Sequence, residues 1–216
     1  MSPPPEFESA GPRRAGFGRR LRLLVLAGSI AGLAPGCALK SGVLPADVES
    51  LVDSHVESLM ASDFPELRGL AIEYRPVDEG ERDDVFFATS VREATVHRKP
   101  PLRTYRLLAN PRLSAERPDP EALHAILAHE LIHLRDYLRM GPVDLILLRK
   151  DYRDDRFRRE YERRTDLRVL EMGFGPELSR YRRWLYGVIR DPEKVAEQQR
   201  VYLTPEEIEA WLAGRR

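Results

Sequence analysis

The sequence predicts an α+β protein in which a small antiparallel or mixed sheet is followed by a mainly helical C-terminal part. Two observations predict this class. Between residues 70 and 109, short segments rich in β-branched and aromatic residues are bounded by proline, asparagine or aspartate. Beyond residue 118, apolar residues instead recur with the period of a helix that is buried on one face. The length of 216 residues suits one domain, and a hydrophobic fraction of 42% is enough for a core.

The first forty residues predict a signal peptide and a lipoprotein-type tether. Five arginines between residues 13 and 22 precede an apolar run over 23–39, and small residues lead to Cys37 near its end. This arrangement resembles a bacterial lipoprotein signal, in which the cysteine is lipidated and becomes the mature N-terminus. We therefore expect a protein anchored through Cys37 to a membrane of the bacterial cell envelope, facing the periplasm or the exterior. An ordinary signal peptide or an N-terminal anchor is the alternative.

Residues 41–216 are expected to form a single domain. Valines and leucines at helical spacing predict a helix over 47–60, and His55, on or beside that apolar stripe, is expected to be a core or boundary residue. His97 is expected at the surface. Four strands with one polar turn are expected, the strands at 70–74, 85–91, 94–97 and 104–109 and the turn at 79–84.

Helix-start and helix-stop residues organise the rest of the chain. Asp119 suits an N-cap and Pro120 a first helical turn, so a helix is expected from there to about Met140. The apolar stretch 143–148 then connects to a charged helix that closes at Gly173. Further helices are expected over about 178–188, after Asp191-Pro192, and after the capping-box sequence at 204–207.

Charge and cysteine content exclude several classes of protein. The chain has 35 basic and 35 acidic residues, so its formal net charge is zero and a strongly cationic nucleic-acid-binding protein is excluded. The arginine-rich stretch 149–168 also carries six acidic residues, which is typical of a solvated helix. The single cysteine excludes an internal disulfide framework and a cysteine-rich zinc finger.

The first expected helix after residue 118 contains a motif that suits a metal ion. His129 and His133 are four residues apart, so in a helix both imidazoles project from one face. Two neutral imidazoles at this spacing can occupy two positions of a tetrahedral Zn²⁺, and Glu130 is placed to accept a proton from water activated by that zinc. This is the H-E-x-x-H arrangement of zinc metalloproteases. Solvated histidines on an amphipathic helix are the alternative.

The charged helix offers a third ligand, which a catalytic zinc requires. Glu162 and Asp166 are four residues apart and share a helical face. One carboxylate can bind the metal while the other accepts the free N–H of a ligating histidine. Other carboxylates compete for the role of ligand, namely Asp136, Glu160 and Glu171.

The sequence His129-Glu130-x-x-His133, followed 29 residues later by Glu162-x-x-x-Asp166, resembles the gluzincin metallopeptidases. It looks most like the compact members related to thermolysin and to the CAAX-prenyl-protease type of membrane peptidase, over about residues 104–173. The resemblance implies a zincin-like fold with zinc bound by His129, His133 and Glu162. It also implies that Glu130 is the general base and that Asp166 orients a histidine.

The resemblance further implies that 104–109 is an edge strand that can pair with an extended peptide substrate. Thr165 stands where the family commonly has alanine, and neither a multi-span membrane region nor thermolysin's second lobe is present, which leaves the subfamily and the substrate open.

Together these features predict a membrane-tethered zinc metalloendopeptidase that acts on a peptide or protein substrate. A non-catalytic envelope lipoprotein, serving as an assembly or binding factor on a peptidase-like fold, is the alternative function. No nucleic-acid partner is expected, and the oligomeric state does not follow from the sequence. An oxyanion donor is also expected, for which the candidates are Tyr137, Tyr152, Tyr161, Tyr181 and Arg180.

Overall fold

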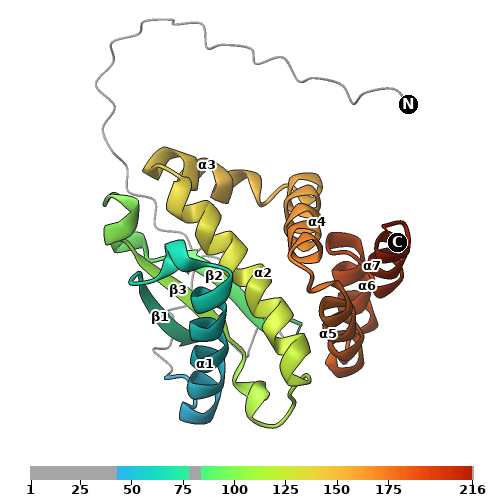
Figure 1. Cartoon of the computed structure of the whole chain (residues 1–216). Helices are drawn as coiled ribbons and strands as arrows, with labels where there is room; N and C mark the ends of the chain where they lie inside the picture. Colours follow the sequence, from blue (N-terminus) through green and yellow to red (C-terminus); the bar gives the residue numbers. More distant parts are fainter. Residues whose placement is uncertain (1–42, 78–83, 216) are drawn as a thin grey trace, which may run out of the picture.

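A three-stranded mixed sheet lies in the N-terminal half of the molecule (Figure 1). The computed structural model describes residues 43–77 and 84–215. Its strands are β1 (Ala71–Pro76), β2 (Phe87–Val91) and β3 (Thr104–Ala109), in the order β1-β3-β2. β1 is parallel to β3 and β2 is antiparallel to it. The predicted α+β class with a mixed sheet is therefore confirmed, whereas Cys37 and most of the turn expected over 79–84 lie outside the described residues.

β3 is the central strand, so the expectation that 104–109 forms a sheet edge is wrong. Its residues pair with β1 on one side and with β2 on the other. Tyr105, Leu107 and Ala109 alternate along the strand, so they share one face of the sheet, and all three are fully buried. Such apolar residues suit a central strand with one face covered by helices. In the described sheet, β2 and β1 are the edge strands.

Two further expectations are corrected by local hydrogen bonding. The segment 94–97 is not a strand, because a short 3-10 helix, η2 (Glu93–Thr95), occupies it. The Thr95 hydroxyl donates to the Arg92 carbonyl at 2.9 Å and accepts from the Thr104 N–H at 3.0 Å, which closes a turn. The apolar stretch 143–148 is not a simple connection but most of a helix, α3 (Pro142–Asp151), that begins with proline at its first position.

The other expected helices are confirmed. Asp119 caps α2 by accepting from the Ala122 N–H at 2.9 Å, and Thr204 and Glu207 form the predicted capping box. The helices are α1 (Ala46–Ser62), α2 (Pro120–Arg139), α4 (Asp155–Glu171), α5 (Gly175–Val188), α6 (Pro192–Val201) and α7 (Pro205–Ala213). Further 3-10 turns are η1 (Pro65–Leu67), η3 (Pro100–Leu102) and η4 (Pro111–Ser114). No helix in the described part of the chain is long and apolar enough to cross a membrane.

Helix α2 lies between the two halves of the molecule (Figure 1). It packs against α1 and β2 on one side and against α4 and α5 on the other. The buried Arg103 fixes its C-terminal end by donating to the carbonyls of Tyr137, at 3.2 Å, and Met140, at 2.7 Å. Because α2 is covered on most sides, polar side chains in its middle are removed from water and require partners.

Candidate metal centre

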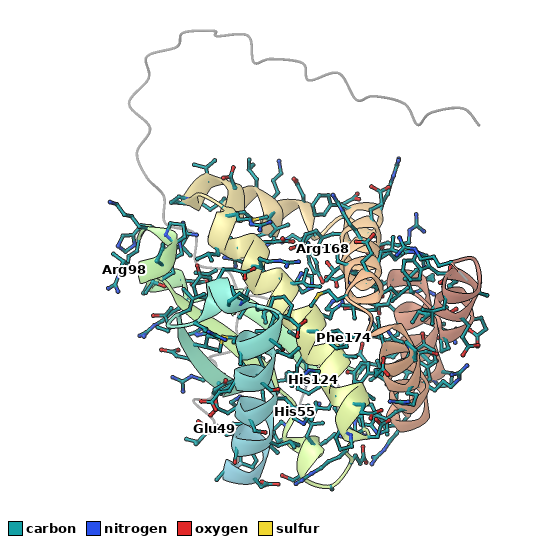
Figure 2. The ribbon with its side chains drawn as sticks, in the orientation of Figure 1. Glu49, His55, Arg98, His124, Arg168 and Phe174 are labelled. Carbon is teal, nitrogen blue, oxygen red and sulfur yellow. The ribbon has the colours of Figure 1, made fainter. Side chains whose placement is uncertain are left out.

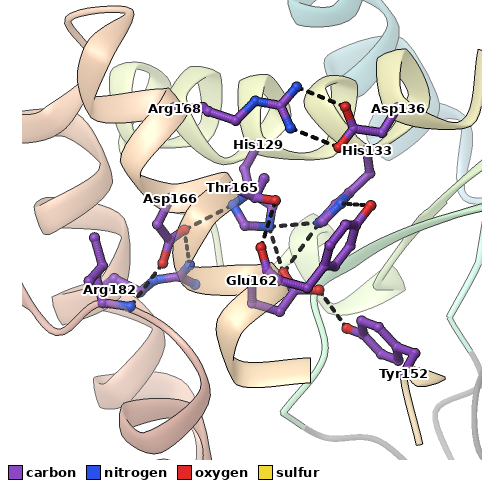
Figure 3. Close-up of polar contacts among 11 residues, drawn as sticks. His129, His133, Asp136, Tyr152, Glu162, Thr165, Asp166, Arg168 and Arg182 are labelled. Atoms are coloured by element: carbon purple, nitrogen blue, oxygen red, sulfur yellow. Dashed lines mark hydrogen bonds and ion pairs between the residues drawn. The ribbon is translucent and has the colours of Figure 1, made fainter. Parts of the chain in front are cut away.

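The two histidines of α2 face each other one helical turn apart (Figure 3). The Nε2 atoms of His129 and His133 are 3.0 Å apart. Both side chains are buried, with 1% and 5% of their residue surface exposed. The predicted juxtaposition on one face of a helix is therefore confirmed, and the alternative of solvated histidines is wrong.

Glu162 of α4 completes a group of three possible ligands. Its Oε2 atom lies 3.0 Å from His129 Nε2 and 3.2 Å from His133 Nε2. Two ligands on a tetrahedral zinc are separated by about 3.3 Å, so these separations are close to those of a zinc site. The residues therefore fit the metal in donor type and spacing: this buried group could hold a metal ion.

Each histidine has a partner for the ring nitrogen that points away from this group. His129 Nδ1 lies 2.9 Å from Asp166 Oδ1, and His133 Nδ1 lies 3.2 Å from the Tyr161 hydroxyl. Such contacts fix the ring orientation and leave Nε2 free to bind a metal. The predicted geometry of Asp166 beside a histidine is thus present, while the partner of His133 was not predicted.

Asp166 is itself held by a buried network. Its Oδ1 accepts from Arg182 Nη2 at 2.9 Å, and its Oδ2 accepts from the Leu203 N–H at 2.9 Å. The Arg182 guanidinium lies 4.3 Å from the centre of the Tyr202 ring, a cation–π contact. Burial alone would raise the pKa of Asp166, but Arg182 and His129 lower it. The carboxylate is therefore ionised and locked in place.

The charges of the group depend on one another. Burial by itself would lower the pKa of His129, but the carboxylates of Asp166 and Glu162 raise it to about 10. Burial would likewise raise the pKa of Glu162, and His133 and His129 hold it well below its usual range. A metal ion must therefore displace a proton from His129, so binding is expected to release protons.

Glu130 lies next to the group but takes no part in it. Its side chain is 5% exposed, and Oε2 is buried with no hydrogen-bond partner among the residues that the structure describes. Burial raises the pKa of Glu130, and the neighbouring His129 and His133 partly oppose that increase. An unpartnered buried carboxylate oxygen is costly, and such an atom is typical of a site that acts on a ligand.

Five side chains are candidates for the oxyanion donor, and the structure gives each of them different contacts. The Tyr152 hydroxyl donates to Glu162 Oε1 at 2.6 Å, and Tyr161 contacts His133. Tyr137 is buried beside the same histidine, with ring centres 6.4 Å apart. Tyr181 lies against Arg182, 5.7 Å from its guanidinium. Arg180 is removed from the candidates, because it is partly exposed and pairs with Glu121.

The carboxylates that compete with Glu162 for the role of ligand either pair with an arginine or are exposed to solvent. Asp136 is bound by both terminal nitrogens of Arg168, at 2.7 and 2.8 Å. Glu160 is exposed and pairs with Arg156, and Glu171 is exposed. Among the candidate ligands, Glu162 is the carboxylate whose oxygen lies within 3.2 Å of both Nε2 atoms, because the helical face that it shares with Asp166 packs against α2.

Three contributors that lie outside the two helices carrying the motif were not predicted. Arg182 comes from α5 and Tyr202 follows α6. Thr89 comes from β2 and lowers the pKa of the Glu130 carboxyl against the effect of burial. Their sequence surroundings contain no motif, so only the packing of distant segments identifies them. No protein-family model, curated protein or solved structure matches the chain, and the site is therefore interpreted from its geometry.

Proposed function

We propose that this protein is a zinc-dependent metallopeptidase, a hydrolase of the gluzincin type. The observation that carries the proposal is the convergence of His129 Nε2, His133 Nε2 and Glu162 Oε2, all within 4.8 Å, beside the unpartnered carboxylate oxygen of Glu130. Three protein ligands leave one position of a tetrahedral metal open, which is the coordination of a catalytic zinc. Two imidazoles and a carboxylate suit zinc as the metal.

The chain's own residues supply the remaining chemistry. Zinc bound by the three ligands would polarise a carbonyl group and make water more acidic. Glu130 accepts the proton of the attacking water and later donates it to the leaving amine, a task helped by a pKa raised through burial. Asp166 and Tyr161 hold the two imidazoles in orientation throughout.

The position of β2 supports an extended peptide as substrate. This edge strand packs against α2, and its buried Thr89 slightly opposes the rise in the pKa of the Glu130 carboxyl that burial causes. An unpaired strand edge offers backbone groups to a peptide that adds as a further strand. Catalysis also requires the site to open, because its ligands and Glu130 are at most 5% exposed.

The test combines metal analysis with hydrolysis of a quenched-fluorescence peptide library. The purified full-length chain should contain about one tightly bound zinc. Glu130→Gln should keep the zinc and lose hydrolysis, and His133→Ala should lose both. Glu160 is an exposed glutamate on α4, so the control variant Glu160→Gln should keep both the zinc and hydrolysis. A folded wild type that takes up no zinc, or a Glu130→Gln variant with full activity, refutes the proposal.

The same burial favours a second candidate, a non-catalytic envelope lipoprotein in which the metal is structural. Every ligand here is at most 5% exposed, so in this structure the group is shut off from solvent and from a substrate, as expected if the metal only stabilises the fold. This candidate predicts that His133→Ala destabilises the protein while Glu130→Gln complements a deletion strain fully. Failure of the Glu130→Gln variant to complement excludes it.

We also propose a membrane tether at Cys37, the residue near the end of the apolar run over 23–39. Metabolic labelling with a radioactive fatty acid should modify the wild type but not Cys37→Ser. The variant should also move from the membrane fraction to the soluble fraction. Unlabelled wild type would show that the segment acts as an ordinary signal or anchor.

A further inference from the structure

A second pair of histidines lies on the α1–α2 interface, outside the candidate metal centre. His55 of α1 and His124 of α2 come together with their Nδ1 atoms 3.3 Å apart (Figure 2). Both side chains are partly buried, and the two residues are 69 positions apart in the sequence. The remaining histidine outside the metal centre, His97, is exposed and lies in the turn after η2.

The separation of the two nitrogen atoms matches two ligands on one metal ion. With a zinc–nitrogen distance of about 2.05 Å and a tetrahedral angle, two imidazole nitrogens lie about 3.3 Å apart. The observed 3.3 Å equals this separation. The same distance also allows an N–H···N hydrogen bond between the two neutral rings, which a bound metal would replace.

The protonation of the pair also suits metal binding. Burial lowers the pKa of His55, and the neighbouring His124 lowers it further. Burial lowers the pKa of His124 as well, although the carboxylate of Asp63 opposes this. Both rings are thus neutral at pH 7, and neutral imidazole is the form that binds a metal.

The two rings are held in place by rigid elements. Both ligands project from helices whose backbones pack together, so the pair exists before any metal binds. The Phe174 ring packs edge-on against His124, with ring centres 5.5 Å apart (Figure 2). This contact limits the orientations of the imidazole and reduces the entropy lost on binding.

We propose that His55 and His124 form a second site, which binds a divalent first-row transition metal with water in the remaining positions. A metal at this site joins α1 to α2, the helix that also carries His129 and His133. Two protein ligands make the site weaker than the three-ligand group. The proposal does not depend on peptidase activity, because it rests on a different pair of residues.

The test is equilibrium dialysis of the full-length chain in detergent against increasing zinc, followed by metal analysis. The wild type should bind about two zinc ions, one tightly and one weakly. His55→Gln and His124→Gln should each abolish the weak step and keep the tight one, which also shows that the variant is folded. His97→Gln, the matched control at an exposed histidine, should keep both steps.

The outcomes separate this site from the candidate metal centre. His133→Ala should abolish the tight step and keep the weak one. If the metal centre binds no zinc, the wild type still shows the weak step, and only the His55 and His124 variants remove it. A weak step that survives in both of those variants, that disappears with His97, or that is absent from the wild type overturns the proposal.

Discussion

Replacing the buried Arg182 by methionine should destabilise the protein because it leaves the Asp166 carboxylate with one fewer counter-charge. Arg182 is 2% exposed and Asp166 is fully buried, and the two are joined at 2.9 Å. Methionine retains much of the length of the side chain but removes the charge. Breaking a buried ion pair from one side costs about 3–5 kcal/mol of unfolding free energy.

The strength of this ion pair is best measured as a coupling free energy between Arg182 and Asp166. Asp166→Asn leaves the Arg182 guanidinium buried without its counter-charge and should cost a similar amount, about 3–5 kcal/mol. If the two effects were independent, the double variant would lose about 6–10 kcal/mol. Because the second substitution removes the charge that the first leaves unpaired, we expect the double variant to lose no more than about one single variant does.

The assay is urea unfolding followed by tryptophan fluorescence, with a chelator present so that metal binding does not contribute. Trp184 on α5 packs edge-on against Phe86 of the sheet half at 4.7 Å, so its emission reports separation of the two halves. Arg183→Met is the control at a half-exposed ion pair and should cost about 0–1 kcal/mol. Additive losses in the Arg182 and Asp166 variants would refute a charge-coupled network.

Three other perturbations have defined outcomes. Tyr152→Phe removes the hydroxyl that donates to Glu162 at 2.6 Å and should weaken zinc binding about tenfold in a chelator competition; unchanged affinity would contradict a supporting role. Thr204→Ala removes the capping hydroxyl of α7 and should cost about 1 kcal/mol in urea unfolding, whereas no loss would show that the cap is dispensable. Since burial lowers the pKa of both His55 and His124, these two residues bind more protons in the unfolded chain below pH 6.5, so their contribution to stability should fall as the pH falls below that value. In chelator, His124→Gln should show a smaller fall in urea midpoint between about pH 7.5 and 5.5 than the wild type; equal falls would contradict this.

Local signals in the sequence predicted most helices and the two histidines of the metal centre. The Asp119 N-cap and the capping box at Thr204 involve residues at most three positions apart, so a short segment contains all their information. The same holds for His129 and His133, whose shared face follows from helical geometry. The alternating apolar residues of 94–97 predict a strand, but the hydroxyl of Thr95 closes a turn there instead.

Spacing along the chain is therefore enough to predict that one helix presents two imidazoles and a glutamate, and that a later helix presents two carboxylates on one face. Which carboxylate meets the imidazoles follows only from the packing of the helices, because Asp136 is bound by Arg168 while Glu162 is turned toward α2. The central position of β3 and the contact of Arg182 with Asp166 likewise follow only from the packing. These outcomes depend on contacts between segments far apart in the chain, which local propensity and spacing do not specify.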